Sequence, residues 1–209
     1  MNLEHYYWYF KSALTPEQCN KIIDLGIKTK SALGTVGGIK IKNYKKISKE
    51  EKNKLIKIRK SNVAWLEDKW LYELITPYVT IANKNANWNF QVDWFENIQF
   101  TIYKKSQFYD WHQDCWDKPY EMPNPNYNGK IRKISATIQL SDPKDYKGGE
   151  LVFDFRNKTN KSSNILKPKE LLPQGTIVVF PSHIHHKVTP VTKGTRYSLV
   201  LWSLGNPWI

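Results

Sequence analysis

The sequence predicts a mainly β fold with helices near the N-terminus, an α+β arrangement built on an antiparallel β-sandwich or barrel. Helical spacing of apolar residues marks two segments of the first part, 16–25 and 68–83. In the second half the pattern changes to short alternating segments separated by turn residues. We therefore expect one domain over 1–209, in which 1–90 provides helical and strand support and 91–209 forms the β core.

The first elements are predicted from local signals. The aromatic stretch 6–10 is typical of a strand, and Thr15-Pro16-Glu17-Gln18 then provides the N-cap, the first-turn proline and the glutamine of a capping box. The helix that starts there should end near Leu25, with Gly26 close to its end. Its buried face should contain Cys19, Ile22 and Ile23.

The region that follows has weaker patterns. Residues 28–50 are rich in Gly and Lys and predict irregular surface structure near the mouth of the site, with turns at Gly34, Gly37 and Gly38. A short strand is expected at 63–66. The second helix has a core-facing stripe and contains Pro77, which should bend it. The stripe consists of Trp70, Leu71, Leu74, Ile75 and Val79.

Alternation of apolar and polar residues begins near Phe90. Strands are expected at 131–140, 150–155, 175–181, 185–191 and 195–203. The Pro- and Asn-rich loop 117–128 leaves directly from the candidate site described below, so it is either a mobile lid or an ordinary surface loop.

The composition bears on partners. The formal net charge of +13 comes from 32 Lys and Arg against 19 Asp and Glu, and it permits attraction to nucleic acid or to an acidic partner. Most of the excess is Lys, accompanied by many Asn, a bias that an AT-rich coding sequence produces without selection for binding. Nucleic acid is therefore not the favoured partner.

Cysteine usage and the N-terminus bear on location. Cys19 and Cys115 are too few for a disulfide framework. The first residues lack the basic and apolar regions of a signal peptide, and no apolar run has the length of a membrane span. We expect a cytoplasmic protein without membrane association.

The strongest chemical signal is His112-x-Asp114. In an extended segment, residues i and i+2 point the same way, so an imidazole and a carboxylate converge on one point. These are two of the three ligands of a facial triad on non-heme Fe(II). His183, His185 and His186 can each supply the third ligand, and spacing alone does not choose among them.

Several motifs of the second half belong together. They are Tyr103, Tyr109-x-x-His112-x-Asp114, Gly148-Gly149-Glu150-Leu151, His186-x-Val188-x-Pro190-Val191 and Arg196-Tyr197-Ser198. This set resembles the Fe(II)/2-oxoglutarate dioxygenases of the prolyl 4-hydroxylase type over about residues 98–203. Leu14–Cys19 and Arg59–Leu66 are similar to the bacterial and phage branch of that family. The resemblance implies a double-stranded β-helix, which is a jelly-roll or cupin-like fold.

This resemblance selects His186 as the third metal ligand beside His112 and Asp114. Strand alternation puts His186 and Val188 on one face, with His185 and Lys187 on the other. His183 and His185 remain the alternatives. Cys115 should point away from the metal as a packed thiol.

The co-substrate 2-oxoglutarate needs a cation for its distal carboxylate, and the planar fork of an arginine suits it. Arg196 is that residue by resemblance, with Arg132, Lys133 and Lys187 as alternatives. Alternation in the last strand puts Ser198 and Trp202 on the same face as Arg196. The resemblance adds Tyr103 and Gln139 as 2-oxoglutarate contacts.

The implied activity is hydroxylation of a prolyl residue in a protein or peptide, with release of succinate and CO2. The implied cofactors are Fe(II), 2-oxoglutarate, O2 and, as a reductant, ascorbate. An acidic segment should bind between 28–50 and 117–128, beside Lys40, Lys42 and Lys118. The alternatives are the same chemistry on a nucleic-acid base or a free amino acid, or a metal-binding jelly roll without catalysis.

One position departs from the family pattern. Ser106 stands where many relatives have glycine, in a turn that requires positive φ. A serine there should be strained, because a side chain disfavours that backbone region.

Overall fold

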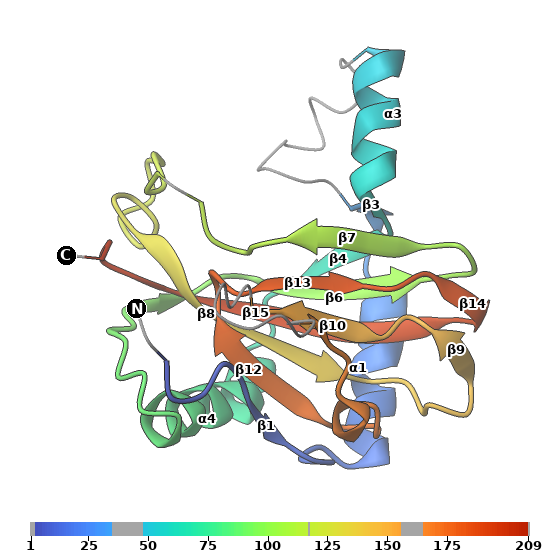
Figure 1. Cartoon of the computed structure of the whole chain (residues 1–209), viewed down its shortest axis with the longest axis horizontal. Helices are drawn as coiled ribbons and strands as arrows, with labels where there is room; N and C mark the ends of the chain where they lie inside the picture. The colour runs from blue at the N-terminus through green and yellow to red at the C-terminus, as the bar shows by residue number, and fades with distance from the viewer. Residues whose placement is uncertain (1–2, 35–47, 117, 156–164, 209) are drawn as a thin grey trace.

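Two antiparallel β-sheets lie face to face in the computed structural model, which describes residues 3–34, 48–116, 118–155 and 165–208 (Figure 1). The larger sheet has the order β1 (Trp8–Phe10), β12 (Ile177–Pro181), β8 (Ile131–Gln139), β15 (Arg196–Gly205), β6 (Ile98–Tyr103), β4 (Asn62–Leu66) and β2 (Ala32–Leu33), and β5 (Trp94–Phe95) also pairs with β15.

The smaller sheet has the order β11 (Ile165–Leu166), β10 (Leu151–Asp154), β13 (His185–Val188), β7 (Phe108–His112) and β3 (Arg59–Lys60). A separate two-stranded ribbon pairs β14 (Val191–Gly194) with β9 (Tyr146–Gly148). A 3-10 turn, η1 (Lys169–Leu171), precedes β12. This arrangement is the double-stranded β-helix that the sequence motifs imply.

Two helices, α1 (Pro16–Lys28) and α4 (Lys69–Asn85), cover the outer face of the larger sheet. Their apolar side chains form one core with residues of β6, β8, β12 and β15, among them Phe100, Ile138 and Leu199. The inner face is left for a smaller apolar cluster around Phe153 and Phe180 and for polar residues. The helices therefore support the larger sheet from its outer face, and the space between the two sheets can contain a site.

The predicted capping box of α1 is confirmed. The Thr15 hydroxyl accepts a hydrogen bond from the Gln18 backbone N–H at 3.2 Å, and the Gln18 side chain accepts one from the Thr15 N–H at 2.8 Å. The predicted end near Leu25 is wrong, because α1 continues to Lys28. Gly26 lies within the helix and permits close packing, since a Cβ there would lie 2.4 Å from the ring of Phe100.

The second predicted helix corresponds to α4, which contains Pro77 and is two residues longer at its C-terminal end than expected. Leu71, Ile75 and Val79 of the expected stripe are buried, whereas Trp70 and Leu74 are partly buried at its edges.

A further helix, α3 (Lys49–Ile58), is missing from the sequence-based prediction. It stands away from the two sheets and touches β3 and β7 with one end (Figure 1). Its sequence is dominated by Lys and Glu and has few apolar residues, so it offers little of the apolar stripe by which a core-facing helix is recognised. The turns expected at Gly37 and Gly38 lie outside the described residues.

The predicted strand 185–191 is divided into β13 and β14. Pro190 falls at the break, because proline has no backbone N–H to give to a ladder. Ser106 has a φ of 65°, which confirms the strained turn expected from the sequence. Within the described part of the chain, no helix has the length and apolar character that crossing a membrane requires.

Candidate metal and co-substrate site

Pairing of two strands brings the candidate metal ligands together. His186 on β13 is directly opposite His112 on β7, and Asp114 follows β7 with its backbone N–H bonded to the Ser182 carbonyl at 2.8 Å. Potential ligand atoms of His112, Asp114 and His186 all lie within 4.8 Å of one another. Nε2 of His112 is 3.8 Å and Nε2 of His186 is 3.5 Å from the Asp114 carboxylate.

The two alternative histidines lie outside this cluster. His185 alternates with the buried His186 along β13, so its side chain is on the other face of the strand. The ring of His183 lies edge-on to Trp208, with 6.3 Å between the ring centroids.

Backbone carbonyls orient both imidazoles. Nδ1 of His112 is 2.7 Å from the Asp110 carbonyl, and Nδ1 of His186 is 2.9 Å from the Ile184 carbonyl. Because a carbonyl only accepts, Nδ1 carries the proton in each ring and the Nε2 lone pair is directed to the cluster. Two such nitrogens and one carboxylate fit a metal such as Fe(II) that needs open coordination positions.

Burial and neighbouring charges set the protonation of this cluster. Burial lowers the pKa of His112 to about 3, and the adjacent His186 acts in the same direction. Burial alone would raise the pKa of Asp114, but His186, His112 and Arg132 outweigh it and lower this pKa to about 2. Near neutral pH, His112 is therefore neutral and Asp114 is ionised, the forms in which these groups bind metals.

Side chains of the larger sheet hold the Asp114 carboxylate. The Ser135 hydroxyl donates to Oδ2 at 2.7 Å and is itself 2.9 Å from the Ser182 hydroxyl. The indole N–H of Trp202 is buried beside the same carboxylate and contributes to its low pKa. It forms no hydrogen bond that meets normal geometry within the described residues. The carboxylate is therefore oriented by groups that do not bind metal themselves.

A chamber between the sheets surrounds the cluster. Tyr103, Thr137, Ser198 and Trp202 line it from the larger sheet, and Tyr109 and Val188 line it from the smaller one. Tyr103 is buried, which raises its pKa, so its hydroxyl stays protonated and can donate to a ligand.

Arg196 is buried in the wall of this chamber, with only 4% of its surface exposed. Its Nε donates to Oε1 of Gln139 at 3.0 Å, and Nη1 donates to the Ser198 hydroxyl at 3.3 Å. Among the described residues, no carboxylate forms an ion pair with Arg196. A buried guanidinium without an anionic partner is suited to a ligand carboxylate.

The three alternative cations have other partners. Arg132 forms two hydrogen bonds with Glu96, at 2.6 and 2.7 Å, and lies over the Trp202 ring. Lys133 lies over Trp208, and Lys187 lies over Trp111.

The sequence motifs did not assign roles to Tyr109 and Arg59. The Tyr109 ring stacks on His112 with 3.4 Å between the ring centroids, and the buried Arg59 guanidinium lies 4.6 Å from the Tyr109 centroid. Nε of Arg59 donates to the Ser61 hydroxyl at 2.8 Å. In the sequence, a role for Arg59 could have been inferred from its spacing to Ser61, because Arg59–Leu66 already resembles the family.

The expected substrate region is only partly described. Lys40 and Lys42 lie outside the described residues, whereas Lys118 is exposed. The loop through 118–128 is tied to the body by Tyr120, whose hydroxyl donates to Glu96 at 2.9 Å and whose backbone N–H bonds to the Lys130 carbonyl at 2.9 Å.

The chain is similar in sequence and in fold to known proteins. The model of the 2OG-Fe(II) oxygenase superfamily matches residues 98–204. A PKHD-type hydroxylase of Shewanella frigidimarina is 38% identical over 104 residues, which cover 49% of this chain and 41% of that protein. The match thus spans about two fifths of the length of this curated relative.

Two solved structures share the fold over nearly the whole chain. The viral collagen prolyl hydroxylase of Paramecium Bursaria Chlorella virus-1 has a TM-score of 0.62 and 18% identity, with 97% of each chain covered. A prolyl-4-hydroxylase of Pseudomonas putida has a TM-score of 0.56 and 18% identity, with 98% of this chain and 95% of that chain covered.

Proposed function

Because the chain belongs to the 2OG-Fe(II) oxygenase superfamily, we propose that it hydroxylates a prolyl residue of a protein or peptide, using Fe(II) held by His112, Asp114 and His186. The observation that carries the proposal is the convergence of these three residues in a chamber lined also by Arg196, which is buried and has no carboxylate partner among the described residues. When bound, the metal would couple O2 activation to conversion of 2-oxoglutarate into succinate and CO2 and to hydroxylation of the substrate.

The protein's own part is orientation and exclusion of water. Arg196 and Ser198 would hold the distal carboxylate of 2-oxoglutarate, and the Tyr103 hydroxyl would donate to the same co-substrate. Trp202 lines the chamber with its indole N–H beside the Asp114 carboxylate, so it would border the bound co-substrate. No side chain is required as a general base in this scheme.

A prolyl peptide is supported as the substrate class by the names of the structural relatives. One of them is a prolyl hydroxylase of Trichoplax adhaerens in complex with a hypoxia inducible factor oxygen degradation domain peptide fragment. For this chain, the net charge of +13 and the exposed Lys118 favour an acidic segment. Its affinity should therefore fall as salt screens the attraction.

The test is a turnover screen with Fe(II), 2-oxoglutarate and ascorbate on prolyl peptides that have either acidic or basic flanking residues. Hydroxylated peptide and succinate should form together, acidic flanks should be preferred, and His186→Ala should form neither product. Turnover of nucleic acid or of a free amino acid, with none on any prolyl peptide, would overturn the substrate assignment and leave the metal chemistry in place. Absence of both metal and 2-oxoglutarate binding would overturn the proposed activity itself.

A further inference from the structure

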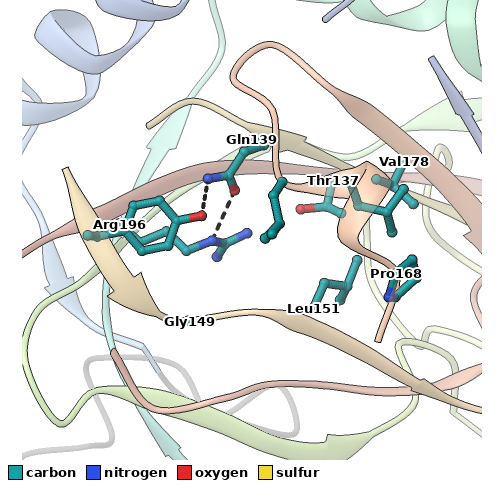
Figure 2. A pocket seen from close by; sticks show the side chains of 10 residues that line it. Thr137, Gln139, Gly149, Leu151, Pro168, Val178 and Arg196 are labelled. Carbon is teal, nitrogen blue, oxygen red and sulfur yellow. Dashed lines mark hydrogen bonds between the residues drawn. The ribbon is translucent and has the colours of Figure 1, made fainter. Parts of the chain in front are cut away.

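The amide of Gln139 has its donors engaged inside the protein. Figure 2 shows two of its hydrogen bonds, one of them with Arg196. Its Oε1 accepts from Nε of Arg196, and its Nε2 donates to the Tyr146 hydroxyl at 2.6 Å and to the Ser141 carbonyl at 3.3 Å. The orientation of the amide is determined by these partners, because Nε of Arg196 can only donate and the Ser141 carbonyl can only accept. Gln139 therefore has no remaining N–H for a bound carboxylate.

The hydroxyl of Tyr146, unlike the Gln139 amide, still has a hydrogen to donate. It accepts a hydrogen bond from Gln139, so its own O–H remains available as a donor. No described residue accepts that hydrogen in a hydrogen bond, although only 5% of the Tyr146 surface is exposed. A buried donor without an acceptor is unfavourable, so the arrangement suits a ligand that supplies one.

Tyr146 and Arg196 line one cavity beside the chamber. Both pack on Gly149, where an added Cβ would lie 3.0 Å from Cδ of Arg196 and 3.6 Å from Cε2 of Tyr146. This cavity adjoins the chamber around the metal cluster, because Thr137, Leu151 and Arg196 line both spaces. The remaining walls there are largely apolar and include Val178 and Pro168 (Figure 2).

We propose that Tyr146 is a co-substrate-binding residue whose hydroxyl donates to the distal carboxylate of 2-oxoglutarate beside the Arg196 guanidinium. Gln139 then acts as a positioning residue that aligns the two donors, in place of the direct contact expected from its sequence position. This inference rests on the proposed function, since it specifies how the same chamber selects a dicarboxylate. The phenol and the guanidinium together distinguish 2-oxoglutarate from a 2-oxo acid that ends in a methyl group.

Binding to the Fe(II)-loaded protein without O2 tests the proposal. Tyr146→Phe removes one hydrogen bond to a charged group and should weaken 2-oxoglutarate about 10- to 150-fold. The affinity for Fe(II) should stay the same. The affinity for 2-oxopentanoate, which has the same carbon chain without the distal carboxylate, should also be unchanged.

Gln139→Met tests the positioning role. This substitution should lower the affinity for 2-oxoglutarate and leave that for 2-oxopentanoate unchanged. Adding Tyr146→Phe should then lower the 2-oxoglutarate affinity by a smaller factor than in the wild-type background, because both changes disturb one hydrogen-bonded unit. Fully independent effects of the two substitutions would contradict that role.

Tyr78→Phe is the matched control, because it removes a hydroxyl that bonds to the Ala13 carbonyl at 3.4 Å, outside the chamber. It should leave both affinities unchanged. Wild-type affinity of Tyr146→Phe for 2-oxoglutarate would overturn the assignment, and so would an equal loss of both 2-oxo acids, which indicates a structural role. Absence of 2-oxoglutarate binding to the wild-type protein would instead overturn the proposed function together with this inference.

Discussion

Oδ2 of Asp114 lies 3.5 Å from Nε2 of His186, at the point where the segment after β7 meets β13. Removing either imidazole of the cluster should abolish tight metal binding, with a loss above the 10- to 100-fold typical for residues that only orient a ligand. His112→Ala and His186→Ala should therefore lose Fe(II) in anaerobic titrations. His183→Ala and His185→Ala are the matched controls, and inactivation by one of these instead would show that the third ligand is misassigned.

Ser135→Ala should weaken metal binding without removing a ligand. The Ser135 hydroxyl donates to Oδ2 of Asp114, so its loss leaves the carboxylate less well oriented. A decrease in Fe(II) affinity of about 10- to 100-fold is expected. Ser203→Ala, which removes a hydroxyl bonded to the Ile134 backbone, should not change metal affinity. Equal effects of the two substitutions would argue against a specific role for Ser135.

Arg196→Ala should lower the affinity for 2-oxoglutarate and leave the affinity for the metal unchanged. Leaving a buried carboxylate without its cation should cost about 2 to 5 kcal/mol, which is roughly a 30-fold to several-thousand-fold loss of affinity. Arg196→Lys should recover only part of this loss, because an ammonium cannot reproduce the two-pronged fork. Calorimetry with Fe(II) and with 2-oxoglutarate separates the two effects. Unchanged 2-oxoglutarate binding in Arg196→Ala would remove this residue from the proposed site.

Glu96→Ala should destabilise the fold by about 3 to 5 kcal/mol, because it leaves the guanidinium of Arg132 buried without its anion. The pair is 11% and 7% exposed, and it also anchors Tyr120 of the 118–128 segment. Urea denaturation measures the free energy of unfolding of Glu96→Ala, Arg132→Met and the double variant. The double variant should be more stable than Glu96→Ala, and additive losses would mean that the pair contributes little.

Ser106→Gly should stabilise the protein by up to about 1 kcal/mol. A side chain in the left-handed backbone conformation at φ 65° costs roughly 1 to 2 kcal/mol, which the glycine variant avoids. The greater conformational freedom of glycine in the unfolded chain offsets part of this stabilisation. Ser106→Val should be destabilising, since a β-branched residue tolerates this conformation least. The melting temperature should rise for Ser106→Gly and fall for Ser106→Val. A lower melting temperature for Ser106→Gly would contradict the proposed backbone strain at this position.

Local sequence signals predicted much of the fold. The capping box at Thr15 and Gln18, the buried stripe of α4 and the alternation along β13 and β15 depend on neighbours within a few positions, so they are readable without coordinates. The same signals failed where packing at a distance decides. Gly26 suits a helix end and lies near it, but α1 continues past it to Lys28, and Gly26 packs closely on Phe100 of β6.

The site shows the same division. Sequence by itself determined which residue types could hold a metal and a dicarboxylate, because His112-x-Asp114, the late histidines and Arg196 are recognisable by spacing and motif. Only the tertiary structure decided that His186 faces His112 across two paired strands, that Arg132 is engaged by Glu96, and that Gln139 points its donors at Tyr146 and Ser141. The physical reason is that strand register and side-chain hydrogen bonds join residues far apart in the chain, and no local pattern records which partners they reach.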